Sequence, residues 1–224
     1  MFFPIGDDNS RRKRVPYVTL GLVALNIVVF LGELFANSQG SLEGVVTRWS
    51  VIPADYTRGT GLGGPVPWTL LTSMFLHGGW AHVIGNLLYL GIFGDNVESV
   101  LGHLSFLAFY LLCGVLASLA HILSAPASTL PSLGASGAIS GVLAAYLVLF
   151  PRNPVLVLVW FQVRAVPALL VIGMWALFQF VVGAGSLAGP RDGGGVAYLA
   201  HVGGFIAGLV LVKLFLPRGE RTAA

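Results

Sequence analysis

The sequence predicts an all-α fold: a membrane bundle of six transmembrane helices with a long first loop on the outer side. Two observations support this prediction. Of the 224 residues, 56% are hydrophobic and 9% are charged, and the mean hydropathy is +0.85, whereas a soluble domain carries about 25% charged residues. Apolar segments also recur along the chain, several of them close to the ~20 residues needed to cross a bilayer.

The first apolar segment, residues 17–36, has the length of a full span. It contains one central polar residue, Asn26, and Glu33 lies near its far end, where we expect it to contact the interface. Residues 37–80 form a long mixed connection, and connections of that length are uncommon unless they are functional or disordered. Five more segments are predicted, at residues 80–93, 104–123, 136–150, 166–183 and 196–216. The second and fourth of the six, residues 80–93 and 136–150, are short for a span.

The distribution of positive charge predicts the orientation in the membrane. If the N-terminus is cytoplasmic, only Arg48, Arg58 and Arg191 lie outside, and the other basic residues lie inside, as the positive-inside rule requires. These are Arg11, Arg12, Lys13, Arg14, Arg152, Arg164, Lys213, Arg218 and Arg221. The chain then divides into a cytoplasmic segment (1–16), a membrane domain (17–216) and a cytoplasmic tail (217–224).

The N-terminal residues give further expectations about location and partners. Residues 1–10 include two aspartates and no apolar core, so we expect no cleaved signal peptide. The absence of an organelle-targeting pattern favours a bacterial plasma membrane. The basic cluster at residues 11–14 adjoins an apolar segment, which favours contact with the lipid bilayer and not with nucleic acid.

This topology brings three polar side chains to one depth. The second, fourth and sixth segments all run from outside to inside, so their N-terminal ends share the outer side of the membrane. Those ends carry His82, Ser136 and His201. Nothing in the hydropathy of the chain requires this coincidence.

Ser136 is the strongest candidate for chemistry. It lies in the run Gly134-Ala135-Ser136-Gly137, where glycine permits a tight turn before a helix. At a helix start, free N–H groups and the dipole stabilise developing negative charge. The alternative is a packing surface, because Gly137, Gly141 and Ala145 recur at four-residue spacing. Both interpretations can hold together.

His201 is the candidate base. It precedes Gly204 and Gly208, a second surface of small residues that suits the segment of Ser136. Neutral imidazole can take a proton from a serine hydroxyl and return it to a leaving amine; the alternative is a histidine bonded to backbone. Asp95, Glu98 and Glu220 lie on the cytoplasmic side and Asp192 lies in an outer loop, so the pattern favours a serine–histidine dyad over a triad.

His82 and Asn86 are four residues apart and share one helix face, so both can donate hydrogen bonds toward one point. His77 lies just upstream. A metal site built from His77, His82 and His201 is the weaker interpretation, because no acidic or cysteine ligand accompanies them in an apolar segment. We therefore expect no metal.

Together these residues resemble the rhomboid family of intramembrane serine proteases, over residues 17–216. The shared features are His77, the His82/Asn86 pair, Gly134-x-Ser136-Gly137 and His201 followed by Gly204 and Gly208. Two features depart from the family: Ser140 stands where some members have a tyrosine, and Arg48-Trp49 replaces a Trp-Arg pair. The tyrosine packs on the histidine, so its loss leaves open what orients His201.

The resemblance implies roles for these residues. Ser136 would be the nucleophile, His201 the general base, and His82 with Asn86 would stabilise the oxyanion. His77 would be structural, and the fifth segment would act as a lateral gate, with Trp175, Leu177 and Phe178 as candidate packing residues. The substrates would be membrane-spanning proteins, and no cofactor is implied.

Two alternative functions compete with proteolysis. A non-catalytic rhomboid-like protein would bind client transmembrane helices, but inactive relatives typically lack the serine or the histidine, and this chain has both. A small-molecule transporter would need matching interrupted segments in two halves and a charged pathway, and the sequence shows neither.

Overall fold

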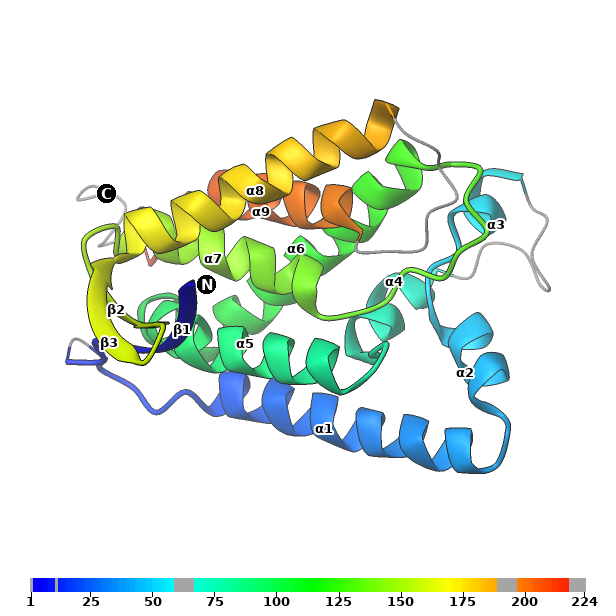
Figure 1. Ribbon diagram of the computed structural model, residues 1–224, viewed down its shortest axis with the longest axis horizontal. Coiled ribbons are helices and arrows are strands. Elements are labelled where there is room, and N and C mark those ends of the chain that lie inside the picture. Colours follow the sequence, from blue (N-terminus) through cyan, green and yellow to red (C-terminus); the bar gives the residue numbers. More distant parts are fainter. Residues whose placement is uncertain (1, 11, 59–66, 189–196, 218–224) are drawn as a thin grey trace.

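The computed structural model describes residues 2–10, 12–58, 67–188 and 197–217. Six long helices occupy the segments predicted to be apolar spans, and they run roughly along the long axis of the molecule (Figure 1). They are α1 (Tyr17–Ser38), α5 (Trp80–Leu101), α6 (His103–Ser124), α7 (Ser136–Leu149), α8 (Ala168–Ala188) and α9 (Tyr198–Phe215).

Four helices in the described part of the chain, α1, α6, α8 and α9, are long and apolar enough to cross a membrane. The fourth predicted segment forms α7, which has only 14 residues. The second forms α5, which carries Asp95, Asn96 and Glu98 toward its end. The protein is therefore mostly helical and is an integral membrane protein.

Helix α5 is longer than the sequence predicts. The predicted segment ends at residue 93, whereas the helix continues to Leu101 and stops at Gly102, whose φ of 81° suits a helix end. Asp95 and Glu98, which follow the predicted end of the segment, are buried and paired with residues near the N-terminus. Arg12 binds Asp95 at 2.9 Å, and Glu98 accepts the backbone N–H of Thr19 at 2.7 Å. These partners are distant in sequence, which is why the helix end was misplaced.

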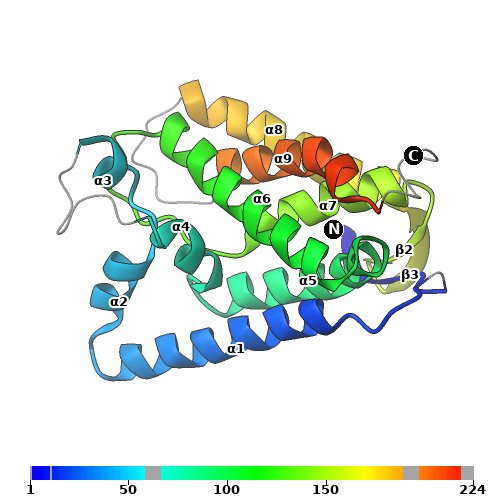
Figure 2. The ribbon, with the colours of Figure 1, turned by 180° about the vertical axis from the view of Figure 1, so that it is seen from behind.

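A three-stranded antiparallel sheet corrects the all-α prediction. Its strands are β1 (Phe2–Asp7), β2 (Pro154–Val159) and β3 (Gln162–Pro167), in the order β1-β2-β3. It packs at the end of the bundle where α8 begins, and both views of the ribbon show it there (Figure 1, Figure 2). The fifth helix consequently begins at Ala168 and not at residue 166. Burial alternates along β2 with the period of two expected of a strand.

The long connection before α5 is also more regular than expected. It contains α2 (Leu42–Trp49), α3 (Pro53–Arg58), α4 (Thr69–Thr72) and a 3-10 turn, η1 (Ser73–Phe75). Val51 and Ser132 exchange two backbone hydrogen bonds, of 3.0 and 2.7 Å. The connection is thereby fastened to the segment that leads into α7.

Helix α7 lies at the centre of the bundle, among α5, α6, α8 and α9 (Figure 1). All ten residues from Gly137 to Tyr146 are buried. A helix that is apolar on every side is stable only when neighbours surround it. The first residue of this central helix is Ser136.

Candidate active site

Ser136 begins α7 directly after a turn that only glycine can make. Gly134 has a φ of 120° and donates its N–H to the carbonyl of Ser73 at 2.8 Å. A Cβ atom at position 134 would lie 2.6 Å from Nε2 of His82. The missing side chain therefore allows the backbone in front of the serine to approach His82.

Ser136 and His201 lie within hydrogen-bond distance, with 2.7 Å between Oγ and Nε2. The other ring nitrogen of His201, Nδ1, lies 2.9 Å from Oε1 of Gln179 on α8. A carboxamide oxygen only accepts hydrogen bonds, so Nδ1 carries the proton and Nε2 accepts from the serine hydroxyl. This is the tautomer that a general base needs.

Gln179 was missed by the sequence analysis. It is a buried, strongly polar side chain in the middle of the apolar helix α8. A polar side chain inside a span is costly and usually faces a partner in the bundle, and that signal could have drawn attention to it. Two rings also flank His201: Trp175 at 6.2 Å and Tyr198 at 6.5 Å between centroids.

Ser140, which stands where some rhomboids have a tyrosine, does not contact the histidine through its hydroxyl. Its Oγ donates to the carbonyl oxygen of Ser136 at 2.6 Å. The orientation of His201 therefore comes from side chains on α8 and at the start of α9. Position 140 on α7, where the tyrosine of some rhomboids packs on the histidine, does not supply it.

The two small-residue surfaces meet at backbone contact. A Cβ atom on Gly204 would lie 2.0 Å from the carbonyl oxygen of Gly137, and one on Gly208 would lie 2.3 Å from that of Gly141. Helices α7 and α9 can approach this closely only because these positions are glycine. This contact sets the separation of the helices that carry Ser136 and His201.

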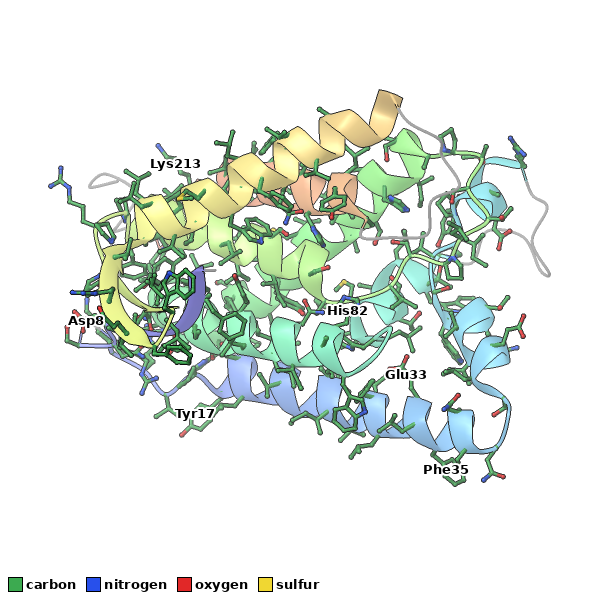
Figure 3. All side chains as sticks on the ribbon, viewed as in Figure 1. Asp8, Tyr17, Glu33, Phe35, His82 and Lys213 are labelled. Atoms are coloured by element: carbon green, nitrogen blue, oxygen red, sulfur yellow. The ribbon has the colours of Figure 1, made fainter. Side chains whose placement is uncertain are left out.

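His82 and Asn86 lie on α5, and His82 lies in the half of the bundle away from the sheet (Figure 3). The N–H of Gly78 donates to Nδ1 of His82 at 3.2 Å, so Nε2 of the neutral ring carries the proton. That Nε2–H lies beside Gly134. Nδ2 of Asn86 is a buried donor without a hydrogen-bond partner among the described residues. Two donors thus lie on the α5 side of the turn before Ser136.

His77 joins the loop before α5 to α1. Its backbone N–H lies 3.1 Å from both carboxylate oxygens of Glu33, and its ring packs edge-on against His82 with 5.2 Å between centroids. Glu33 was expected at the membrane interface, but it is buried. Burial, and then the neighbouring His82, lowers the pKa of His77 to about 4, so the ring is neutral.

A cavity of about 30 Å³ lies beside Ser136. That volume can hold a water molecule if polar groups line it, and Ser73, Ser118 and Ser132 are among its lining residues. Within the described ranges, no group of three or more histidine, cysteine or acidic side chains is placed to hold a metal ion.

Comparison with known proteins identifies the family. Residues 65–218 match the model of the Rhomboid domain. The chain is 32% identical over 214 residues to Rhomboid-like protein 11, chloroplastic, of Arabidopsis thaliana, an alignment that covers 92% of this chain and 68% of that protein. It is 32% identical over 146 residues to Rhomboid protein 1, mitochondrial, of Saccharomyces cerevisiae, covering 63% and 40%.

A bacterial relative has a higher identity over a shorter region. Rhomboid protease GluP of Bacillus subtilis is 45% identical over 80 residues, which is 36% of this chain and 15% of that protein. Because other relatives are chloroplastic and mitochondrial, the comparisons do not support the predicted bacterial plasma membrane. The domain match spans more than half of the chain, and the chain therefore belongs to the rhomboid family.

Proposed function

We propose that the protein is an intramembrane serine endopeptidase that hydrolyses peptide bonds in or near the transmembrane segments of membrane proteins. The observation that carries this proposal is the 2.7 Å contact between Ser136 Oγ and His201 Nε2, with Nδ1 of the histidine bound to Gln179. A serine hydroxyl is a weak nucleophile until a base is placed to remove its proton.

The reaction would proceed in two stages. Ser136 Oγ attacks the scissile carbonyl carbon while its proton passes to Nε2 of His201, and a tetrahedral oxyanion forms. His201 then gives that proton to the departing amine, which leaves an ester on Ser136. Water, deprotonated by the same nitrogen, attacks the ester and releases the second product, and the proton returns to the serine.

We assign the stabilisation of the oxyanion to His82 and Asn86. Nε2–H of His82 and Nδ2 of Asn86, which has no partner among the described residues, are both donors near the turn before Ser136. The first N–H groups of α7 have no partner within the helix and add a positive helix end. Donors that are already oriented stabilise developing charge without reorganisation, which is the largest contribution in many hydrolases.

The membrane arrangement belongs to the same proposal. Six spans with both termini in the cytoplasm would place Ser136 toward the outer side, and residues 17–216 would form one membrane domain. Lipid excludes the water that hydrolysis needs, and the polar cavity beside Ser136 offers a place for it. A substrate helix must unwind before its carbonyl reaches the serine, because helical carbonyls are already bonded.

The test uses purified protein in liposomes with a single-span substrate. The wild type is compared with Ser136→Ala and His201→Ala. A positioned base contributes about 10²–10⁴-fold, so both variants are expected to lose cleavage while keeping their thermal unfolding temperature. Equal cleavage by all three proteins would contradict the proposal.

The alternative is a non-catalytic rhomboid-like protein that binds client transmembrane helices. A serine-directed fluorophosphonate distinguishes the two functions without a natural substrate. Labelling at Ser136 that requires His201 supports the protease. A wild type that binds single-span peptides but is neither labelled nor active would favour the binding function.

A further inference from the structure

The outer surface of the three-stranded sheet is apolar and exposed. Pro4, Val155 and Val157 are buried beneath the sheet. On the opposite face, Phe3, Leu158 and Val163 pair directly across the three strands and are all exposed. Paired residues share one face of a sheet, so these side chains form a continuous apolar row that turns away from the bundle.

The turn that joins β2 to β3 extends this row with two aromatic side chains. Val159 pairs with Gln162, so the turn consists of Trp160 and Phe161 alone. They are 83% and 97% exposed, respectively. We call this pair and the row of Phe3, Leu158 and Val163 the sheet surface.

Trp160 occupies a backbone conformation that disfavours it. Its φ is 56°, and among the described non-glycine residues it alone has a positive φ. Two-residue hairpin turns with positive φ usually contain Asn, Asp or Gly. The sequence instead holds a large ring there at a conformational cost, and this exposed ring has no aromatic neighbour within the described part of the chain. Contact with a partner outside the chain therefore explains the aromatic side chain better than packing within the fold does.

We propose that the sheet surface inserts into the headgroup region of the lipid leaflet at the end of the bundle where α8 begins. The sheet lies at the end of the bundle where α8 begins (Figure 1), and the ends of membrane-spanning helices reach the interface between hydrocarbon and water. Tryptophan is enriched at that interface because its ring is both apolar and polar.

Continuity with the lipid-facing surface supports a lipid partner. Strand β3 ends at Pro167 and the apolar helix α8 begins at the next residue, where Leu169 and Leu170 are exposed. Arg152, in the turn before β2, is exposed, and arginine side chains near the ends of spans reach the interface and attract anionic headgroups. The sheet surface therefore extends a surface that already faces lipid.

Pairing of a second copy along the edges of the sheet is disfavoured. The edge strands carry Pro4 on β1 and Arg164 with Pro167 on β3. Proline and charged residues on edge strands prevent the addition of a further strand.

Spin labels placed in nanodiscs with anionic lipid test the proposal. A label on Val163→Cys keeps both turn aromatics, and a label on Ser10→Cys marks an exposed polar site at the same end of the bundle. Cys113 is buried, and wild-type protein carried through labelling corrects for any reaction there. Collisions with oxygen are expected to exceed those with a water-soluble nickel chelate at position 163, and the reverse is expected at position 10.

A matched variant separates lipid insertion from folding. Trp160→Gly places glycine at the position with positive φ, and Phe161→Ser removes the second exposed ring, so the thermal unfolding temperature in detergent should stay or rise. The nickel collision rate at position 163 should increase several-fold. Four results would each overturn the proposal: equal nickel access at positions 163 and 10, no effect of the turn variant, dipolar broadening between labels of two copies, or an oxygen preference that requires added substrate.

Discussion

Gln179→Leu should damage catalysis without damaging the fold. Leucine has a similar size but cannot accept the Nδ1–H of His201, which now lies 2.9 Å from the carboxamide oxygen. A buried donor left unpaired costs about 1–3 kcal/mol. The imidazole can escape that cost by moving its proton to Nε2, but Nε2 would then donate to Ser136 and could no longer accept its proton.

The expected loss in kcat follows from this cost. If the free energy of holding the productive tautomer is about 1–3 kcal/mol, kcat should fall roughly 5- to 160-fold. KM should stay nearly constant, because Gln179 acts through His201. Gln179→Glu retains an acceptor of the same length and should keep most of the activity. Gln39→Leu is the matched control, because Gln39 is exposed beyond the end of α1.

The assay measures cleavage of a single-span substrate in liposomes over a range of substrate fractions. Thermal unfolding and the rate of fluorophosphonate labelling are measured on the same preparations. A kcat for Gln179→Leu within twofold of the wild type would refute the reasoning. So would equal losses for the leucine and glutamate variants, since only one of them lacks an acceptor.

Three further predictions concern other parts of the molecule. Asn86→Ala should lower kcat by about 10²–10³-fold through loss of an oxyanion donor, with an unchanged unfolding temperature; normal kcat would contradict it. Gly204→Ala should lower the free energy of unfolding by about 1–3 kcal/mol, because the new methyl group would collide with Gly137. Gly173→Ala, which has nothing within 4 Å of the added Cβ, should leave it unchanged, and calorimetry would measure both. Burial raises the pKa of Asp7 from 3.8 to about 6, so the folded protein binds a proton there more tightly than the unfolded chain does. The stability of the wild type should therefore fall as pH rises through that range. Asp7→Asn should have a higher unfolding temperature than the wild type only toward neutral pH.

The helices were predictable because the signal for a membrane helix lies in composition over about 20 residues. The six apolar segments were therefore located. Their ends were predicted wrongly where contacts with residues distant in sequence determine the end of the helix. The side chains of Asp95 and Glu98 are buried because Arg12 forms an ion pair with Asp95 and Thr19 donates a hydrogen bond to Glu98. A partner so far away in sequence leaves no local pattern.

The sheet was missed for a related reason. Strand β1 lies near the N-terminus and pairs with β2, whose residues follow α7. Residues 154–165 were left in the connection between the fourth and fifth predicted segments, and only Val166 and Pro167 of the sheet fell within the predicted fifth segment. Burial alternates between Val155, Leu156, Val157 and Leu158, but hydrophobicity does not, because both faces of this sheet are apolar.

The candidate site shows the same division. Motif spacing and topology singled out Ser136 and His201, and in the structure they lie 2.7 Å apart. The groups that orient His201 were not predicted. Gln179 shares no motif with it, and only the packing of α8 against α9 brings the carboxamide to the ring.

The geometry of the site depends on two kinds of helix contact. Helices α7 and α9 touch through backbone at Gly137 and Gly204, so the Ser136–His201 distance is fixed by atoms that cannot rotate away. Helix α8 acts on the histidine through side chains, the carboxamide of Gln179 and the ring of Trp175. A larger residue at the glycine contact should therefore cost stability and activity together. A change at Gln179 should cost activity alone, because it alters which nitrogen carries the proton and leaves the packing of the helices intact.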